Sequence, residues 1–213
     1  MARYLEGRTK LSKRVGKNLF LKGARSFSAK DDFTKRPYKA GEHGGVRGKR
    51  PGRVSEYGKQ LLEKQVLRYT YGLMEKQLSN VFKKAFKTKG DTGIIAMQLL
   101  ERRLDNVVYK SGLANSLAQA RQLVAHGHFE VNGHKCDIPS ALVYTNDVIT
   151  IKANKLKSAF WTTFSLQVPN TVPAWLDTGR KNETKVINLP LVEDLPQNIN
   201  IAPVVEFYSR TVA

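Results

Sequence analysis

The pattern of hydrophobic residues between residues 101 and 152 most constrains the fold of this chain. Apolar side chains recur at helical spacing up to Gly112, and again between Ser116 and Gly127. A glycine just past the last apolar residue is a common end of a helix, and Ser116 with Gln119 three residues later is a capping-box pattern. The stretch therefore predicts two short helices joined by a brief loop.

The residues that follow predict antiparallel strands. Phe129 starts an alternation of apolar and polar residues that runs to Asn132-Gly133, a dipeptide that favours a tight hairpin. A second turn at Asn146-Asp147 leads into the apolar run of residues 148–151. We therefore expect an α+β fold that contains a small α/β module, a helix-loop-helix followed by antiparallel strands.

Basic side chains gather around the predicted helix starts and hairpin turns of this stretch. They are Arg102, Arg103, Arg121, His126, His128 and Lys135. Helix N-termini and tight turns edged with such groups can bind phosphate. The alternative is a solvated basic rim without a ligand, because runs of charge are often only exposed faces. The spacing of these residues leaves both interpretations open.

The charge of the whole chain favours a polyanionic partner. The 213 residues include 36 Lys and Arg against 18 Asp and Glu, a net charge of +18, and residues 1–60 alone contribute +12. Such a balance is typical of proteins that bind nucleic acid or an anionic membrane. The longest apolar run, residues 94–100, is too short to span a bilayer, and the first ten residues show no apolar signal core, so we expect no membrane partner. The single Cys136 cannot form an intramolecular disulfide, which favours a reducing, cytoplasmic location.

Residues 1–53 predict a basic N-terminal extension. Apolar residues are sparse here, apart from a short cluster at residues 19–21, so the segment should depend on a partner for order. Within residues 36–53, glycines would let the backbone approach a phosphate ridge, arginines supply forked donors and Tyr38 offers a stacking face. The alternative interpretation is a disordered basic linker.

The signals that follow predict an all-helical domain. Ser55 can cap a helix that runs to about Gly72, a second helix is expected from about Met74 to Lys87, and a third starts near Asp91. We expect this helical domain to span residues 54–100 and to be completed by residues 173–213. The module would then occupy residues 101–172.

Three segments of the module carry a family resemblance. Residues 103–109 read Arg-Leu-Asp-Asn-Val-Val-Tyr, residues 120–124 read Ala-Arg-Gln-Leu-Val and residues 128–133 read His-Phe-Glu-Val-Asn-Gly. They resemble the RNA-binding module named after the fourth protein of the small ribosomal subunit, and the remainder of the chain resembles the bacterial family of that protein. The last segment, residues 204–210, is similar to the family's ending, so we expect it to pack back on the early helices.

The resemblance implies a structural protein rather than an enzyme, with no cofactor and no small-molecule substrate. It implies direct, early binding to 16S rRNA and nucleation of the body of the small subunit. It also implies contact with the fifth small-subunit protein, a part in decoding accuracy with the fifth and twelfth proteins, and a place near the mRNA where it enters the ribosome. The alternative is an RNA-modification or stress-response protein that uses the same module as an accessory.

The basic residues and the resemblance together predict the rRNA-binding residues. In the extension and the helical domain they are Arg3, Arg8, Lys13, Arg14, Lys22, Arg25, Arg36, Tyr38, Lys39, His43, Gly44, Arg47, Lys49, Arg50, Arg53, Lys64, Arg68, Lys83 and Lys84. In the module they are Arg102, Arg103, Ser116, Arg121, His126, His128, Asn132 and Lys135. Family members usually carry arginine just after Ser116, where this chain has Leu117, so we expect Arg103 and Arg121 to carry more of the contact.

No catalytic or metal site is expected. Two His or His/Cys pairs flank one predicted hairpin, but structural zinc normally needs four close ligands. Asp105 lies in an Arg-Leu-Asp context that superficially resembles the catalytic segment of pseudouridine synthases carrying the same module, but the flanking residues differ. We expect Asp105 to support the helix start or a neighbouring arginine instead.

Many bacterial members of the resembled family hold the N-terminal segment with zinc bound by four cysteines. The matching positions here are Thr9, Ser12, Ser26 and Asp31, and zinc favours Cys and His over such oxygens. We therefore expect the extension to keep a similar path without metal. Hydrogen bonds from Ser12, Ser26 and Asp31, the apolar cluster at residues 19–21 and rRNA phosphates should hold it.

Overall fold

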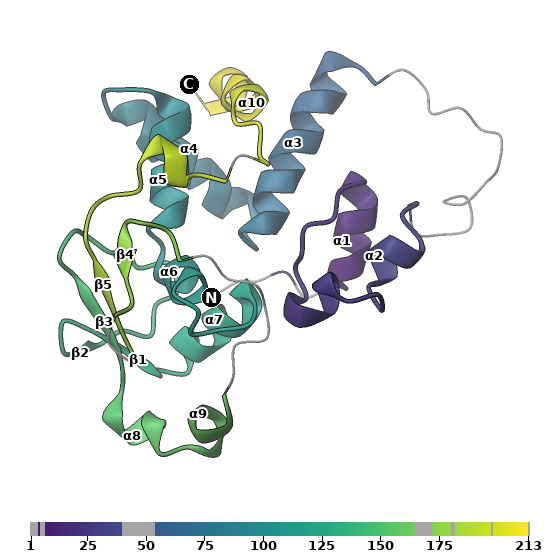
Figure 1. Cartoon of the computed structure of the whole chain (residues 1–213). Coiled ribbons are helices and arrows are strands. Elements are labelled where there is room, and N and C mark those ends of the chain that lie inside the picture. The colour runs from purple at the N-terminus through teal and green to yellow at the C-terminus, as the bar shows by residue number, and fades with distance from the viewer. Residues whose placement is uncertain are drawn as a thin grey trace. The chain divides into compact units, whose positions relative to one another are not determined.

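The computed structural model describes residues 4, 7–39, 54–164, 172–179, 182–196 and 198–212. The chain forms two compact units (Figure 1), a helical unit of Met1–Ala96 with Pro196–Ala213 and a second unit of Met97–Leu195. Among the described residues, no helix combines the length and hydrophobicity that a membrane span requires.

Helices from distant parts of the chain make the core of the helical unit. They are α3 (Glu56–Thr70), α4 (Glu75–Lys87) and α10 (Ala202–Val212), and α5 (Thr92–Glu101) leads out of this unit. Leu78 and Phe82 of α4 are fully buried, and Tyr208 of α10 stacks on Phe82 with ring centroids 4.5 Å apart. Because α10 packs on both α3 and α4, the prediction that the C-terminal segment returns to the early helices is confirmed.

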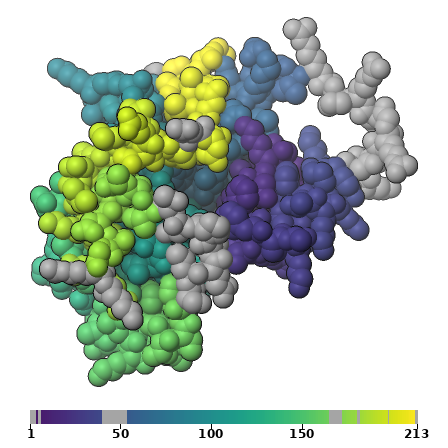
Figure 2. Space-filling view, in the orientation of Figure 1, coloured from purple at the N-terminus to yellow at the C-terminus, as the bar shows by residue number. Residues whose placement is uncertain are grey.

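Three short helices precede α3 in the helical unit. They are α1 (Arg8–Val15), η1 (Gly23–Phe27) and α2 (Asp32–Lys35). Leu11 and Val15 of α1 are buried, and α1 packs against α2 and α3. Figure 2 shows these residues, in purple, as one continuous mass. Gly16, with φ of 71°, lets the chain turn sharply at the end of α1.

The second unit contains the predicted helix pair, α6 (Leu104–Lys110) and α7 (Leu117–Ala125). The Ser116 hydroxyl accepts a hydrogen bond from the Gln119 backbone at 3.2 Å, so the predicted cap is confirmed. The antiparallel sheet has the order β2-β1-β3-β5-β4. Its strands are β1 (Phe129–Val131), β2 (His134–Lys135), β3 (Val148–Ile151), β4 (Leu176–Asp177) and β5 (Glu183–Val186). The α+β prediction is confirmed.

The turn between β1 and β2 has the predicted hairpin geometry. Asn132 and Gly133 have φ angles of 52° and 79°, and a two-residue hairpin of this type needs positive φ at both positions. Phe129 of β1 lies opposite Ile151 of β3. Both side chains enter a core that also contains Leu104 of α6. The buried face of the sheet thus fixes the strand register.

The sheet extends beyond the predicted module. Ile149 of β3 lies opposite Thr184 of β5, and β4 pairs with β5. Residues 176–186 therefore belong to the second unit, and only the chain from Pro196 onward returns to the helical unit. The prediction that residues 173–213 as a whole complete the helical domain is corrected here. Pairing between β3 and β5 depends on residues far apart in sequence, and no local pattern reveals it.

Three short elements complete the second unit, α8 (Ala153–Leu156), α9 (Ala159–Thr163) and η2 (Val192–Asp194). Phe160 and Trp161 of α9 pack against the core of this unit. The Trp161 indole also donates to Nδ1 of His128 at 2.9 Å. These contacts hold α8 and α9 beside β1 (Figure 1).

Candidate nucleic-acid interface

The N-terminal helices carry a large excess of positive charge. Residues 7–39 contain eleven Lys and Arg but only two acidic residues. Asp31 is buried, and Asp32 is shared by Lys22 at 3.5 Å and Arg25 at 3.3 Å. Other cations are exposed and form no ion pair within the described residues: Lys30, Lys35, Arg36 and Lys39. This excess needs counter-charge from outside the segment, which phosphates can supply.

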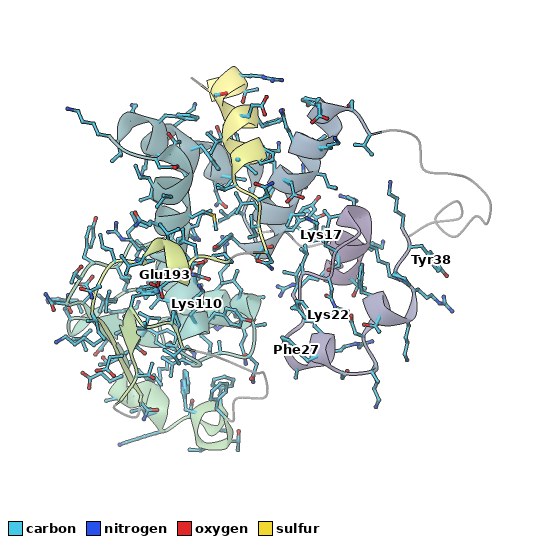
Figure 3. The ribbon with its side chains drawn as sticks, turned by 45° about the horizontal axis from the view of Figure 1, so that its top comes forward. Lys17, Lys22, Phe27, Tyr38, Lys110 and Glu193 are labelled. Carbon is cyan, nitrogen blue, oxygen red and sulfur yellow. The ribbon has the colours of Figure 1, made fainter. Side chains whose placement is uncertain are left out.

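Exposed aromatic rings lie among these cations. The Lys13 ammonium lies 6.0 Å from the ring centroid of Tyr38, which is 48% exposed. Phe20 and Phe27 stack on each other with centroids 4.9 Å apart, and both are exposed. Figure 3 shows Phe27 and Tyr38 in the same N-terminal part of the chain. Rings of this kind can stack on unpaired RNA bases. The phenylalanines were not among the predicted contacts.

Two arginines of α1 also hold the fold. Arg8 donates from Nη1 to the Leu21 carbonyl at 3.2 Å. Arg14 donates from Nη1 to the Tyr69 hydroxyl at 3.3 Å and thereby joins α1 to α3, although its side chain remains exposed. If either arginine contacts a phosphate, it does so in addition to its hydrogen bond within the protein.

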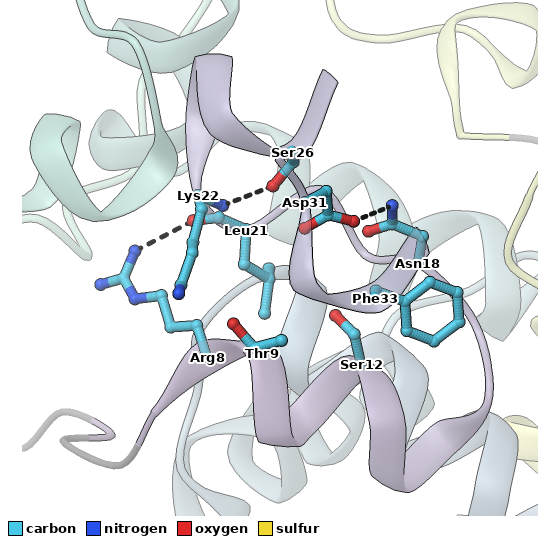
Figure 4. A pocket seen from close by; sticks show the side chains of 9 residues that line it. All are labelled: Arg8, Thr9, Ser12, Asn18, Leu21, Lys22, Ser26, Asp31 and Phe33. Atoms are coloured by element: carbon cyan, nitrogen blue, oxygen red, sulfur yellow. Dashed lines mark hydrogen bonds between the residues drawn. The ribbon is translucent and has the colours of Figure 1, made fainter. Parts of the chain in front are cut away.

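The four positions where many bacterial members of the resembled family carry cysteine come together in this chain. Thr9, Ser12, Ser26 and Asp31 line one small pocket formed by α1, η1 and the start of α2 (Figure 4). Within the described residues, no group of three or more His, Cys, Asp or Glu side chains is arranged to hold a metal ion. Three hydroxyls and one carboxylate do not suit zinc.

Hydrogen bonds from three of these four positions hold the segment. The Ser12 hydroxyl accepts from the Leu19 backbone at 3.4 Å and the Ser26 hydroxyl accepts from the Lys22 backbone at 3.1 Å. Asp31 accepts from the Asn18 side chain at 3.1 Å and caps α2. The predicted hydrogen-bonding role of Ser12, Ser26 and Asp31 is confirmed.

The outer face of α4 forms a second basic surface, the α4 lysine face. Its lysines are exposed and lie opposite the buried Leu78 and Phe82. They are Lys76, Lys83, Lys84 and Lys87. No ion pair involves these lysines in the part of the chain that the structure describes. Lys83 and Lys84 were predicted contacts, and Lys76 and Lys87 extend the same face at helical spacing.

Lys64 and Arg68 of α3, both predicted contacts, face inward instead. Lys64 is 2.8 Å from Glu75 and 4.4 Å from the ring centroid of Phe207, and its side chain is only 8% exposed. Arg68 lies 3.4 Å from the same carboxylate, and the Tyr208 hydroxyl donates to it at 2.8 Å. These residues form the Glu75 cluster, which joins α3, α4 and α10. The acidic partner comes from another helix, so the sequence of α3 alone could not reveal it.

Charges in the Glu75 cluster shift the pKa values of its acids. Burial alone would raise the pKa of Glu75, but hydrogen bonds from Lys64 and Tyr208 and the positive charges of Lys64 and Arg68 outweigh it and lower that pKa. Burial, followed by the hydrogen bond to Glu75, strongly raises the pKa of Tyr208. At neutral pH the cluster therefore holds a carboxylate with three donors around it.

Arg103 and Arg121 of the module share one buried carboxylate. Arg103 donates from Nε and Nη2 to Asp105 at 3.1 and 2.8 Å, and Arg121 lies 3.8 Å from the same group. The exposed fraction of the side chain is 8% for Arg103 and 1% for Asp105. The prediction that Asp105 supports a neighbouring arginine is confirmed. Arg103, expected to be a main contact, points inward, while Arg121 is 12% exposed.

The half-buried Arg102 and the exposed Tyr144 form a pair in the second unit. Arg102 donates from Nε to the Val143 carbonyl at 3.0 Å, which fixes its guanidinium 4.7 Å from the ring centroid of Tyr144. Tyr144 is 60% exposed. A fixed cation beside an open ring is suited to a phosphate next to a stacked base. Tyr144 was missed in the sequence because it lies far from Arg102 in the chain, and the predicted turn at Asn146-Asp147 does not indicate that its ring meets this arginine.

The predicted contacts near the β1–β2 hairpin differ in accessibility. His126 and Lys135 are exposed, although Lys135 lies 3.1 Å from Asp137. Asn132 is exposed as well, but its side-chain carbonyl accepts from the Val148 backbone at 2.9 Å and stabilises the turn. The Ser116 hydroxyl is likewise used within the fold, as the cap of α7.

His128 is held by its own neighbours. Its Nδ1 accepts the Trp161 hydrogen bond, so this ring nitrogen is the unprotonated one. Burial, followed by the charges of Lys155 and His126, lowers the pKa of His128 below its ordinary value. At neutral pH this residue contributes a neutral ring rather than a cation.

Seven predicted contacts lie outside the described residues. They are Arg3, His43, Gly44, Arg47, Lys49, Arg50 and Arg53. Glu42, which stands where glutamine is usual in the resembled family, lies outside as well.

Known proteins match the whole chain. Residues 3–101 match the family model of the ribosomal protein S4/S9 N-terminal domain, and residues 102–149 match that of the S4 domain. The small ribosomal subunit protein uS4 of Clostridium tetani (strain Massachusetts / E88) is 44% identical over 211 residues, which cover 99% of this chain and 100% of the relative. The protein of the same name from Syntrophus aciditrophicus (strain SB) is 47% identical over 216 residues, and that of Thermodesulfovibrio yellowstonii (strain ATCC 51303 / DSM 11347 / YP87) 43% over 212, with the same coverage. The chain therefore belongs to the uS4 family of ribosomal proteins.

Proposed function

We propose that this chain is a structural protein of the small ribosomal subunit in the cytoplasm, and that it binds 16S rRNA directly. The observation that carries this proposal is the excess charge of residues 7–39, which hold eleven cations against two acids. Lys17 is paired with Glu63 outside the segment, whereas Lys30, Lys35, Arg36 and Lys39 are exposed and form no ion pair within the described residues. Exposed rings next to these cations suit RNA better than a purely anionic surface.

The rRNA contacts divide among three exposed surfaces. The first comprises the N-terminal cations with Tyr38, the second is the α4 lysine face and the third is the Arg102–Tyr144 pair with His126 and Lys135. Arg121, whose side chain is 12% exposed, would add a further contact in the second unit. Lys64 and Arg103 would act only by stabilising the fold, because their side chains are each 8% exposed and are engaged by Glu75 and Asp105.

The family resemblance, rather than the surfaces themselves, supports the proposal that the protein binds rRNA early in assembly. We propose, as the family resemblance implies, that it nucleates the body of the subunit and later contacts the fifth small-subunit protein and the mRNA where it enters. Its part in decoding accuracy would be exerted with the fifth and twelfth proteins. These finer roles rest on the resemblance and not on any contact in this chain.

The alternative of an RNA-modification enzyme receives no support from the geometry. Asp105, the one residue in a catalytic-looking context, is 1% exposed and is engaged by Arg103. A nucleophilic carboxylate must reach its substrate, and this one does not. The match over 99% of the chain to proteins named as ribosomal proteins favours the structural role.

Salt dependence of binding to protein-free 16S rRNA tests the proposal. Log affinity falls as log salt rises, and each phosphate contact contributes about 0.7–0.9 to the magnitude of this slope. Replacing Lys30, Lys35, Arg36 and Lys39 together by Gln should therefore make the slope shallower by about 3. The control is Lys64→Met, which removes one equally charged but internal group and should leave the slope unchanged. Equal slopes for the quadruple variant and the unaltered protein would refute the N-terminal contact.

Assembly order tests the finer role. The protein should bind 16S rRNA when added first and alone, and its omission should block stable addition of the fifth protein. Binding that requires other proteins beforehand would contradict nucleation but would leave rRNA binding itself intact.

A further inference from the structure

An exposed strip of the second unit is apolar and acidic, whereas the proposed rRNA-binding surfaces are basic. It follows β5 and consists of Ile187, Leu189, Leu191, Val192 and Glu193, here called the apolar–acidic strip. The four apolar side chains are 44%, 40%, 63% and 59% exposed. Exposed apolar clusters of this kind are typical of protein interaction sites.

The strip is held by its backbone, so its apolar side chains are not needed to order it. The Ile187 backbone donates to the Trp175 carbonyl at 2.9 Å, and the Gln98 side chain donates to the Pro190 carbonyl at 2.8 Å. Asp194 accepts from the Leu191 backbone at 3.0 Å and closes the turn of η2. The side chains are thus presented on a fixed scaffold, which lowers the entropic cost of docking a partner.

The local charge excludes rRNA as the partner of this strip. No lysine or arginine occurs from residue 186 to residue 209, although the chain contains 36 of them. Glu193 is exposed and forms no ion pair within the described residues, and Figure 3 shows it on the turn of η2. A phosphate backbone would be repelled by this carboxylate and would find no cation to bind among residues 186–209.

We propose that the apolar–acidic strip docks a basic, apolar-containing segment of a neighbouring small-subunit protein. Residues 1–53 of this chain illustrate such a segment, since they combine many cations with the short apolar cluster at residues 19–21. Apolar contacts to Leu191 and Val192 supply the affinity, and a cation beside Glu193 sets the register. A symmetric contact between two copies of this chain is disfavoured, because it would bring Glu193 near its own copy. The inference rests on the proposed place of the chain in the ribosome.

Site-specific photo-cross-linking in assembled small subunits tests the inference. The full-length protein carries benzoylphenylalanine at position 191, is assembled into subunits and is purified with them by sedimentation. We expect the cross-link at position 191 to reach a Lys/Arg-rich peptide of another protein. The matched control is the same group at position 80, where Asn80 is exposed between Lys76 and Lys83, and there we expect rRNA.

A charge reversal gives a second readout. Glu193→Lys should lower the yield of the protein cross-link about 2- to 5-fold, the range of one exposed ion pair, while Glu193→Gln should lower it less. Cross-links from position 191 to rRNA or to a second copy, or no protein product in normally sedimenting subunits, would overturn the inference alone. Failure of the protein to enter subunits would overturn the proposed function along with it.

Discussion

The Glu75 cluster allows one quantitative prediction about the helical unit. Replacing Glu75 by Gln keeps the shape of the side chain but removes the charge that faces Lys64 at 2.8 Å and Arg68 at 3.4 Å. Among the described residues, Lys64 would then keep the rings of Phe207 and Tyr208 as electrostatic partners, 4.4 and 5.9 Å from its ammonium, and its side chain is 8% exposed. The variant therefore leaves a nearly buried cation without a counter-ion.

The expected loss lies between two known limits. Breaking a fully buried pair costs about 3–5 kcal/mol, and an exposed pair contributes about 0–1 kcal/mol. Lys64 is nearly buried, but the Glu75 side chain is 42% exposed, so water screens part of the interaction. We expect Glu75→Gln to lower the free energy of unfolding by about 2 kcal/mol.

Urea unfolding of the free protein, followed by far-UV circular dichroism, measures this loss. The control is Glu56→Gln, which removes a similar pair with Lys59 whose side chains are 80% and 60% exposed, and which should cost under about 0.5 kcal/mol. Lys64→Met in a double-mutant cycle with Glu75→Gln should recover most of the loss, because the more deeply buried of the two cations is then gone and Arg68, at 18% exposed, has more access to water. Equal costs for Glu75→Gln and Glu56→Gln would refute the reasoning.

The same cluster predicts a pH dependence. The folded pKa of Glu75 is lowered from about 4.5, so its contribution is complete above that pH and is lost as the pH falls through the lower folded pKa. The free energy of unfolding should therefore decline more steeply with acid in the unaltered protein than in Glu75→Gln. Identical pH profiles would contradict the assignment of the shift to this carboxylate.

Three further predictions concern the other surfaces. The double variant Lys83→Gln, Lys84→Gln should reduce the magnitude of the salt dependence of 16S rRNA binding by about 1.5 and leave the unfolding midpoint unchanged. An unchanged salt dependence would show that both lysines face solvent and do not contact rRNA. The pKa of His128 is lowered from 6.5, so the stability of the second unit should fall as the pH drops below about 6.5. Tryptophan fluorescence of this unit, from Trp161 and Trp175, follows its unfolding, and a stability that stays constant down to the onset of general acid unfolding would contradict this. Ser26→Ala removes the acceptor of the Lys22 backbone and should cost about 1 kcal/mol and increase proteolysis near η1, whereas added chelator should change nothing in the unaltered protein; chelator-dependent cleavage would show a metal after all.

Short-range signals in the sequence determined much of the second unit. These signals act within a few residues, so their consequences can be predicted without knowledge of the fold. The spacing of Leu104 and Val107 predicts α6, and Ser116 with Gln119 predicts the start of α7. Asn132-Gly133 predicts the hairpin. The basic character of residues 1–53 and the choice of a polyanionic partner also follow from the sequence, because charge adds up regardless of conformation.

Only the tertiary structure decided which cations face solvent and where the second unit ends. Nothing in the sequence distinguishes Lys64 and Arg103 from the exposed basic residues. In the structure both side chains are buried, because Lys64 pairs with Glu75 of another helix and Arg103 pairs with the buried Asp105. In the same way β5 joins β3, and Ser26 and Asp31 meet Ser12 around one pocket, through contacts between segments that are apart in the chain. Burial and pairing depend on which segments pack together, and that is a property of the whole fold rather than of any local stretch.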